Sequence, residues 1–143
     1  MKDMTREEII SFIKDWTWGT LLGVEGDKPY AVEVSYGTDG EYLYCGTRPG
    51  GRMWKCVSEN PNVGFKICDS DRSCNRWHAV LIEGVAQRLT SREDILYSCR
   101  CIASQMGLPR EAFDRIAEHA GADQKSNSLK IPLARISGKA IGT

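Results

Sequence analysis

The sequence has no excess charge of either sign, no long apolar run and only two histidines. Its 143 residues carry 19 lysines and arginines against 19 aspartates and glutamates, so the formal net charge at pH 7 is zero. A balanced charge argues against a general nucleic-acid or membrane-surface binder, which would present a one-sided field. No apolar stretch approaches the roughly 18 residues of a membrane span, and the N-terminal residues lack the apolar segment of a signal peptide. We therefore expect a cytoplasmic protein with neither a nucleic-acid nor a membrane partner.

The six cysteines do not have the spacing of a metal site. Zinc sites use tight pairs such as CxxC, and the closest pair in this chain is Cys99 and Cys101. Residues two apart on a helix point to different faces, which makes joint chelation there unfavourable. Disulfide frameworks belong mainly to short secreted chains. We expect free thiols and no bound metal.

Hydrophobic periodicity predicts a small antiparallel barrel in a single domain, residues 1–143. Thr5 and Glu8 form a capping box before a helix at 6–15. Six strands at short spacing, with helices inserted rather than alternating, indicate a mainly β fold of the six-stranded barrel type. The expected strands are 19–24, 29–36, 41–45, 63–67, 77–89 and 129–137, and helices are expected after Gly51 and at about 91–105 and 109–119.

The segment from Tyr44 to Lys55 carries the clearest chemical signal. A predicted strand ends at Thr47, two glycines follow, and a helix begins directly after Gly51. Free amides at the start of a helix, and the helix dipole, favour an anion. Arg48, Arg52 and Lys55 add positive charge, with no acidic residue between positions 41 and 59. The segment predicts a phosphate site; the alternative is a turn whose basic side chains are merely solvated.

An ordered series of segments resembles a known family over nearly the whole chain. The segments are 26–36, the Asp39-Gly40 hairpin with 42–44, Gly51-Arg52, Asn60-Pro61, 77–84 and 129–139. In this order they resemble the FMN-binding split barrel of the pyridoxamine 5'-phosphate oxidase superfamily, above all the short branch that includes the nitroimidazole-resistance reductases. The resemblance implies a homodimer with FMN at the subunit interface and a small-molecule substrate.

The resemblance also implies which residues bind the cofactor. Thr47 and Arg52 would hold the phosphate, and residues 32–35 would follow the edge of the isoalloxazine through their backbone. Met53 departs from the Ser-Arg-Lys pattern of the oxidases, so one cation is missing, and Arg48 or Lys55 would compensate. The candidate cofactor-binding residues are Val32, Glu33, Val34, Ser35, Thr47, Arg48, Gly51, Arg52, Met53 and Lys55.

The expected function is an FMN-dependent oxidoreductase acting on a small organic molecule. No residue is singled out as a catalytic acid, base or nucleophile, and no GxGxxG motif offers a second phosphate site for FAD. One alternative is a non-catalytic carrier of flavin or haem, in which His78, His119 or a cysteine would be the axial ligand of haem. Another is a redox sensor that uses Cys45 or Cys56 beside the site. The apolar residues of the helices at 91–119 would pack against the barrel or cover the site.

Overall fold

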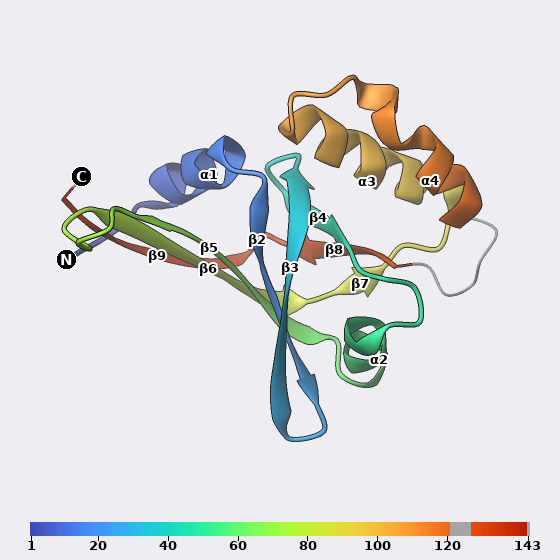
Figure 1. The fold of residues 1–143 in the computed structure, drawn as a ribbon, viewed down its shortest axis with the longest axis horizontal. Coiled ribbons are helices and arrows are strands. Elements are labelled where there is room, and N and C mark those ends of the chain that lie inside the picture. The colour runs from blue at the N-terminus through green and yellow to red at the C-terminus, as the bar shows by residue number, and fades with distance from the viewer. Residues whose placement is uncertain (121–126, 143) are drawn as a thin grey trace.

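The strands of this protein form a curled antiparallel sheet (Figure 1). The computed structural model describes residues 1–120 and 127–142. In this part of the chain nine strands follow the order β1-β9-β6-β5-β2-β3-β4-β8-β7, and all neighbouring pairs are antiparallel. The mainly β, split-barrel architecture predicted from the sequence is therefore confirmed. The strands are β1 (Lys2–Asp3), β2 (Trp18–Glu25), β3 (Lys28–Thr38), β4 (Tyr42–Gly46), β5 (Asn62–Ser70), β6 (Trp77–Val85), β7 (Gln87–Arg88), β8 (Ser128–Pro132) and β9 (Arg135–Ile141).

The strand count exceeds the predicted six because two predicted strands divide and a short one was missed. The segment at 77–89 leaves its ladder with β5 after Val85, and β7 pairs with β8 instead. Ala86 marks the change, since its amide donates to the carbonyl of Pro61. The segment at 129–137 turns between β8 and β9 at positions 133–134. Strand β1 has two residues, which is too short for a periodic signal.

The helices lie where the apolar spacing places them, with one division. The predicted helix at 109–119 begins with a tighter 3-10 turn and continues as a separate α-helix. Arg100, on the preceding helix, donates two hydrogen bonds to Asp114, the first residue of that α-helix. The helices are α1 (Arg6–Asp15), α2 (Arg52–Glu59), α3 (Arg92–Gln105), the 3-10 helix η1 (Arg110–Phe113) and α4 (Asp114–Ala120).

Helix α1 starts at the predicted capping box and packs through its apolar face. The amide of Glu8 donates to Thr5 Oγ1 at 3.2 Å, and the amide of Thr5 donates to Glu8 Oε1 at 3.0 Å. Ile9, Phe12 and Ile13 are buried in the main core together with the inward side chains of the strands. Helix α1 therefore covers this end of the core with the apolar face that its residue spacing predicts.

Helix α3 is fixed against β3 by a close approach of two backbones. A Cβ atom at Gly37 would lie 2.5 Å from the carbonyl oxygen of Cys101, so only glycine permits this packing distance. The amide nitrogen of the Gln105 side chain donates to the carbonyls of Ile13 at 2.9 Å and Trp16 at 2.8 Å. Helix α3 is therefore held at a defined place over β3 and next to the end of α1.

This packing predicts the effect of filling the space at Gly37. Gly37→Ala should lower the free energy of unfolding by about 1–3 kcal/mol, because the added methyl group meets backbone rather than a flexible side chain. Denaturant unfolding measures the change. Gly46→Ala is the matched control on β4, since its Cβ would meet its nearest neighbour at an ordinary 3.7 Å. Equal stabilities of the two variants would contradict the proposed packing of α3.

Candidate functional site

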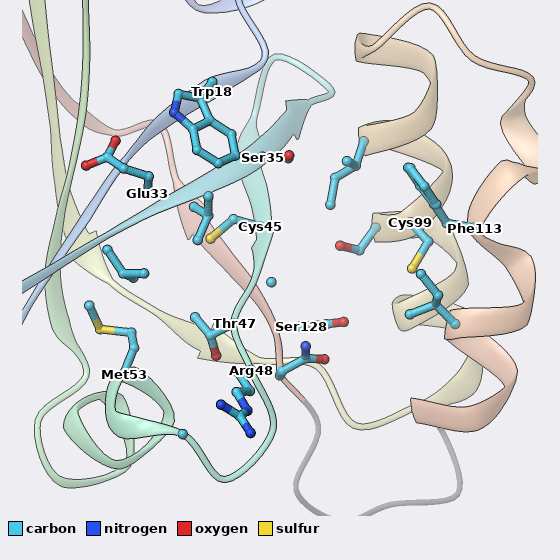
Figure 2. Close-up of a pocket in the computed structure, with 18 of the residues that line it drawn as sticks. Trp18, Glu33, Ser35, Cys45, Thr47, Arg48, Met53, Cys99, Phe113 and Ser128 are labelled. Atoms are coloured by element: carbon cyan, nitrogen blue, oxygen red, sulfur yellow. The ribbon is translucent and has the colours of Figure 1, made fainter.

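A cavity of about 760 Å³ lies between the β3–β4 part of the sheet and helix α3. Figure 2 shows Ser35, Cys45 and Thr47 on the strand side and Cys99 and Phe113 on the helical side. A volume of this size suits a cofactor or a drug-sized ligand. The lining residues are Trp18, Tyr30, Val32, Glu33, Val34, Ser35, Cys45, Gly46, Thr47, Arg48, Gly51, Arg52, Met53, Ser98, Cys99, Ile102, Phe113, Ile116, Asn127 and Ser128.

The buried serine and threonine residues of the described chain all line this cavity. They are Thr47, Ser98 and Ser128. Buried polar groups cost free energy unless they find a hydrogen-bond partner, so a core normally avoids them. Their concentration here separates the cavity from the apolar core and indicates a binding site.

The strand wall offers a free backbone edge. Strand β3 pairs with β2 from Lys28 to Ser35, but it pairs with β4 only at Tyr36, Gly37 and Thr38. In the described chain, residues 28–35 therefore have ladder partners on one side alone. The predicted residues Val32, Glu33, Val34 and Ser35 belong to this half-paired stretch and all line the cavity. Their amides and carbonyls can hydrogen-bond the edge of a planar ligand.

The start of α2 lies at one end of the cavity. Strand β4 ends at Gly46, and the amide of Thr47 donates to the carbonyl of Asn127 at 2.9 Å, which fixes the chain just before the turn. Gly51 precedes α2, no side chain caps the helix, and its first turn holds no acidic residue. The first amides of α2 are thus left for a ligand, and Arg48 lies in the same lining. This is the arrangement that the sequence predicts for a phosphate.

Arg52 lines the cavity but is already oriented by two other side chains. Its Nε lies 3.0 Å from Glu25 Oε2, and its guanidinium carbon lies 4.1 Å from the centre of the Tyr30 ring. Within the described residues the two terminal guanidinium nitrogens make no further hydrogen bond, so they stay available as a fork for an anion. Because both charged groups are about half exposed, this ion pair orients the arginine more than it stabilises the fold.

Met53 is a packing residue, which explains the missing cation. It is buried, and a Cβ atom at Gly23 on β2 would lie only 2.9 Å from its sulfur. An ammonium group in this position would be removed from water over an apolar strand, at a high cost. Lys55, the last of the predicted binding residues, is exposed on α2 and is not part of the cavity lining.

The cavity thiols are neutral rather than reactive. Cys45 and Cys99 line the cavity, and burial raises the pKa of Cys45 to about 12 and also raises the pKa of Cys99. Burial likewise raises the pKa of Cys56, which lies outside the lining. The thiolate is the nucleophile of cysteine chemistry, so raised pKa values disfavour the sensor hypothesis for Cys45 and Cys56.

The two histidines lie away from the cavity. His78 Nδ1 is 2.9 Å from Asp69 Oδ1, and its ring packs on Phe12 with centroids 4.9 Å apart. His119 is exposed near the end of α4. Neither belongs to the lining, so in this structure neither is placed to be the axial ligand of a haem bound in the cavity of the same chain.

The helical wall of the cavity had two roles open to it in the sequence, packing against the barrel or covering the site. Ile102, Phe113 and Ile116 line the cavity together with Ser98 and Cys99. Their apolar spacing was visible, and covering the site was one of its two readings. The same spacing serves a helix that packs on a core and one that closes a cavity, so the pattern could not decide between them.

Two other features that would point to a function, a membrane-spanning helix and a metal-binding cluster, are absent from the described residues. Among them, no helix combines the length and hydropathy needed to cross a bilayer. Nor do these residues bring three or more histidine, cysteine, aspartate or glutamate side chains together in a way that could hold a metal ion.

Comparison with known proteins identifies the family. The family model described as pyridoxamine 5'-phosphate oxidase matches residues 5–140, and the chain belongs to this family. A protein of Rhizobium meliloti (strain 1021), RA0666, is 30% identical over 91 residues, which are 63% of this chain. The match spans 58% of that relative's length.

Two solved structures illustrate the shared fold. A candidate 5-nitroimidazole antibiotic resistance protein of Bacteroides thetaiotaomicron has a TM-score of 0.79 at 17% identity, covering 97% of this chain and 87% of that one. An FAD-binding protein of Mesorhizobium loti, mll6688, has a TM-score of 0.71 at 16% identity, with 99% and 98% covered. At these identities the likeness establishes the fold alone.

Proposed function

We propose that this chain binds FMN in the cavity and uses it to oxidise or reduce a small organic molecule. The observation that carries the proposal is one cavity that joins an anion-binding helix start to a free strand edge. The first suits a phosphate and the second suits the polar edge of a planar ring. Membership of the pyridoxamine 5'-phosphate oxidase family supports the same reading.

The redox chemistry would be supplied by the flavin itself. Glu33 is the only carboxylate among the described lining residues, and it accepts the hydroxyl hydrogen of Thr20, whose Oγ1 lies 2.9 and 2.8 Å from its two oxygens. The cavity thiols are neutral, and the histidines lie elsewhere. The role of the protein is therefore to bind and orient the cofactor and to limit the access of water.

FMN is favoured over FAD by the distribution of positive charge. Arg48 and Arg52 are the cations of the described lining, and both lie beside the start of α2. This provides one phosphate site, as a mononucleotide requires. The FAD-binding protein of Mesorhizobium loti makes FAD the alternative that the first experiment has to distinguish.

Mass spectrometry identifies the cofactor directly. The purified protein, reconstituted with an equimolar mixture of FMN and FAD, should release FMN on denaturation, and its absorption spectrum should have the two broad visible bands of a flavin. Release of FAD alone would contradict the proposed specificity for a mononucleotide. A dominant Soret band after addition of haem, with no flavin retained, would support the carrier alternative instead.

Arg52 and Thr47 should differ in their contributions to phosphate binding. Arg52→Ala removes a charged fork and should weaken FMN by about tenfold or more, whereas Thr47→Ala removes one neutral donor and should cost about fivefold. Lys55→Ala, on the same helix with the same charge but outside the lining, is the control and should leave the affinity unchanged. Fluorescence titration with FMN measures all three variants.

Riboflavin, which lacks the phosphate, separates a phosphate ligand from a structural residue. Its affinity should be nearly the same in Arg52→Ala, Thr47→Ala and the unmodified protein. An equal loss for riboflavin and FMN in Arg52→Ala would show that this arginine supports the fold of the site. A loss of FMN in Lys55→Ala, and none in Arg52→Ala, would move the phosphate to the outer side of α2.

A second copy of the chain is proposed to cover the mouth of the cavity. Two apolar lining residues, Trp18 and Ile116, are 60% and 56% exposed, which leaves apolar surface at the rim. Exposed apolar surface around a binding site is typical of an interface. A two-fold symmetric dimer would bury this rim and place the flavin between the subunits.

Light scattering at micromolar concentration tests the dimer. We expect twice the 16.0 kDa mass of one chain. Ile116→Ser at the rim should shift the mass towards one chain, whereas Met106→Ser, an exposed apolar residue outside the lining, should not. A single-chain mass for the unmodified protein would contradict the proposed assembly.

A further inference from the structure

The hydroxyl of Ser98 is a buried polar group without a partner. Ser98 is 1% exposed, and its Oγ makes no hydrogen bond. A serine within a helix can donate back to the carbonyl four residues earlier, but Ser98 makes no such bond. In this rotamer the oxygen is also shielded from solvent, so the folded protein carries an uncompensated desolvation cost at Ser98, which a turn of the side chain towards a ligand in the cavity would remove.

The position of Ser98 is fixed rather than loosely packed. Its helix, α3, is held by the close approach at Gly37, by the two hydrogen bonds from Gln105 and by the Arg100–Asp114 pair. A small shift of the helix therefore cannot bring the hydroxyl to a new protein partner. A hydrogen-bond partner for the Ser98 hydroxyl therefore has to be a group that approaches α3.

The cavity is the place from which a partner can come. Ser98 lines it, whereas the other buried unpaired atoms of the described chain, Trp54 Nε1 and Arg88 Nε, belong to residues outside the lining. Of the three buried serine and threonine residues that line the cavity, only Ser98 has a side-chain oxygen that is both buried and unpaired in the described chain. Ser98 is thus the open hydrogen-bonding position in the wall opposite the strands.

We propose that Ser98 is a cofactor-binding residue whose hydroxyl hydrogen-bonds a polar atom of the flavin ring that β3 leaves unpaired. This inference rests on the proposed function, since it concerns the same cavity. The neighbouring lining residues Ile102 and Phe113 contact the apolar part of the ligand, and Ser98 supplies the single polar contact from α3. The protein then keeps an unpaired hydroxyl in its unliganded state, and binding of the ring removes this cost.

The test is a variant that should be more stable and bind less tightly. Ser98→Ala removes the hydroxyl with little change of volume. The thermal midpoint of the unliganded protein should rise by about 2–4 °C. Its affinity for FMN and for riboflavin should fall by the same factor, about fivefold, because a contact with the ring does not depend on the phosphate. Ser104→Ala, exposed on the same helix and outside the lining, is the control and should change neither quantity.

Each other outcome overturns a defined part of the inference. A lower midpoint in Ser98→Ala would show that the hydroxyl has a partner within the protein. Unchanged affinities would remove Ser98 from the ligand contacts, and a loss for FMN alone would assign it to the phosphate end. If the unmodified protein binds neither FMN nor riboflavin, the proposed function fails first, and the role of Ser98 fails with it.

Discussion

The site depends on the early separation of β4 from β3. The two strands pair at only three positions, Tyr36, Gly37 and Thr38, and then diverge, although β3 continues alongside β2 to Lys28. The divergence leaves one edge of β3 free and carries the end of β4 towards the start of α2. The short paired stretch also contains Gly37, against which α3 packs. One local feature of strand pairing therefore opens the cavity, supplies its backbone groups and fixes its opposite wall.

The sequence predicts most of the fold because its periodic segments are unambiguous. The capping box at Thr5 and the apolar spacing of α1 give the helix with its observed bounds, and the alternation from Tyr30 to Tyr36 gives β3. The turn between β8 and β9 was missed because it contains Leu133, a buried apolar residue, where turns usually have glycine, proline, asparagine, aspartate or serine. Its amide donates to the carbonyl of Glu41, a partner far away in the sequence. Turns held by long-range bonds leave no local signal.

The candidate site was predictable where it depends on neighbouring residues and not where it depends on distant ones. The glycines and cations from Arg48 to Arg52 are consecutive, so they indicate an anion site by themselves. The partners that orient Arg52, Glu25 and Tyr30, come from the β2–β3 hairpin and have no spacing relation to it. Ser98 is a stronger example. A serine inside a helix gives no sign in the sequence that its hydroxyl is buried, unpaired and beside a cavity.

The contact between Met53 and Gly23 limits how the charge of this site can change. Lysine at position 53 would restore the cation of the oxidase pattern, but its stem would have to cross the surface of β2 that the methionine now fills. A single Met53→Lys substitution would therefore lose the packing of the methionine on β2, a cost that the new ion pair would first have to offset. The two positions form a unit, because a side chain added at Gly23 would displace Met53, and a shorter residue at 53 would leave a gap over the strand. Any route from this chain to a more strongly charged phosphate site has to alter both positions together, or to begin from Arg48, where the side chain is already in water.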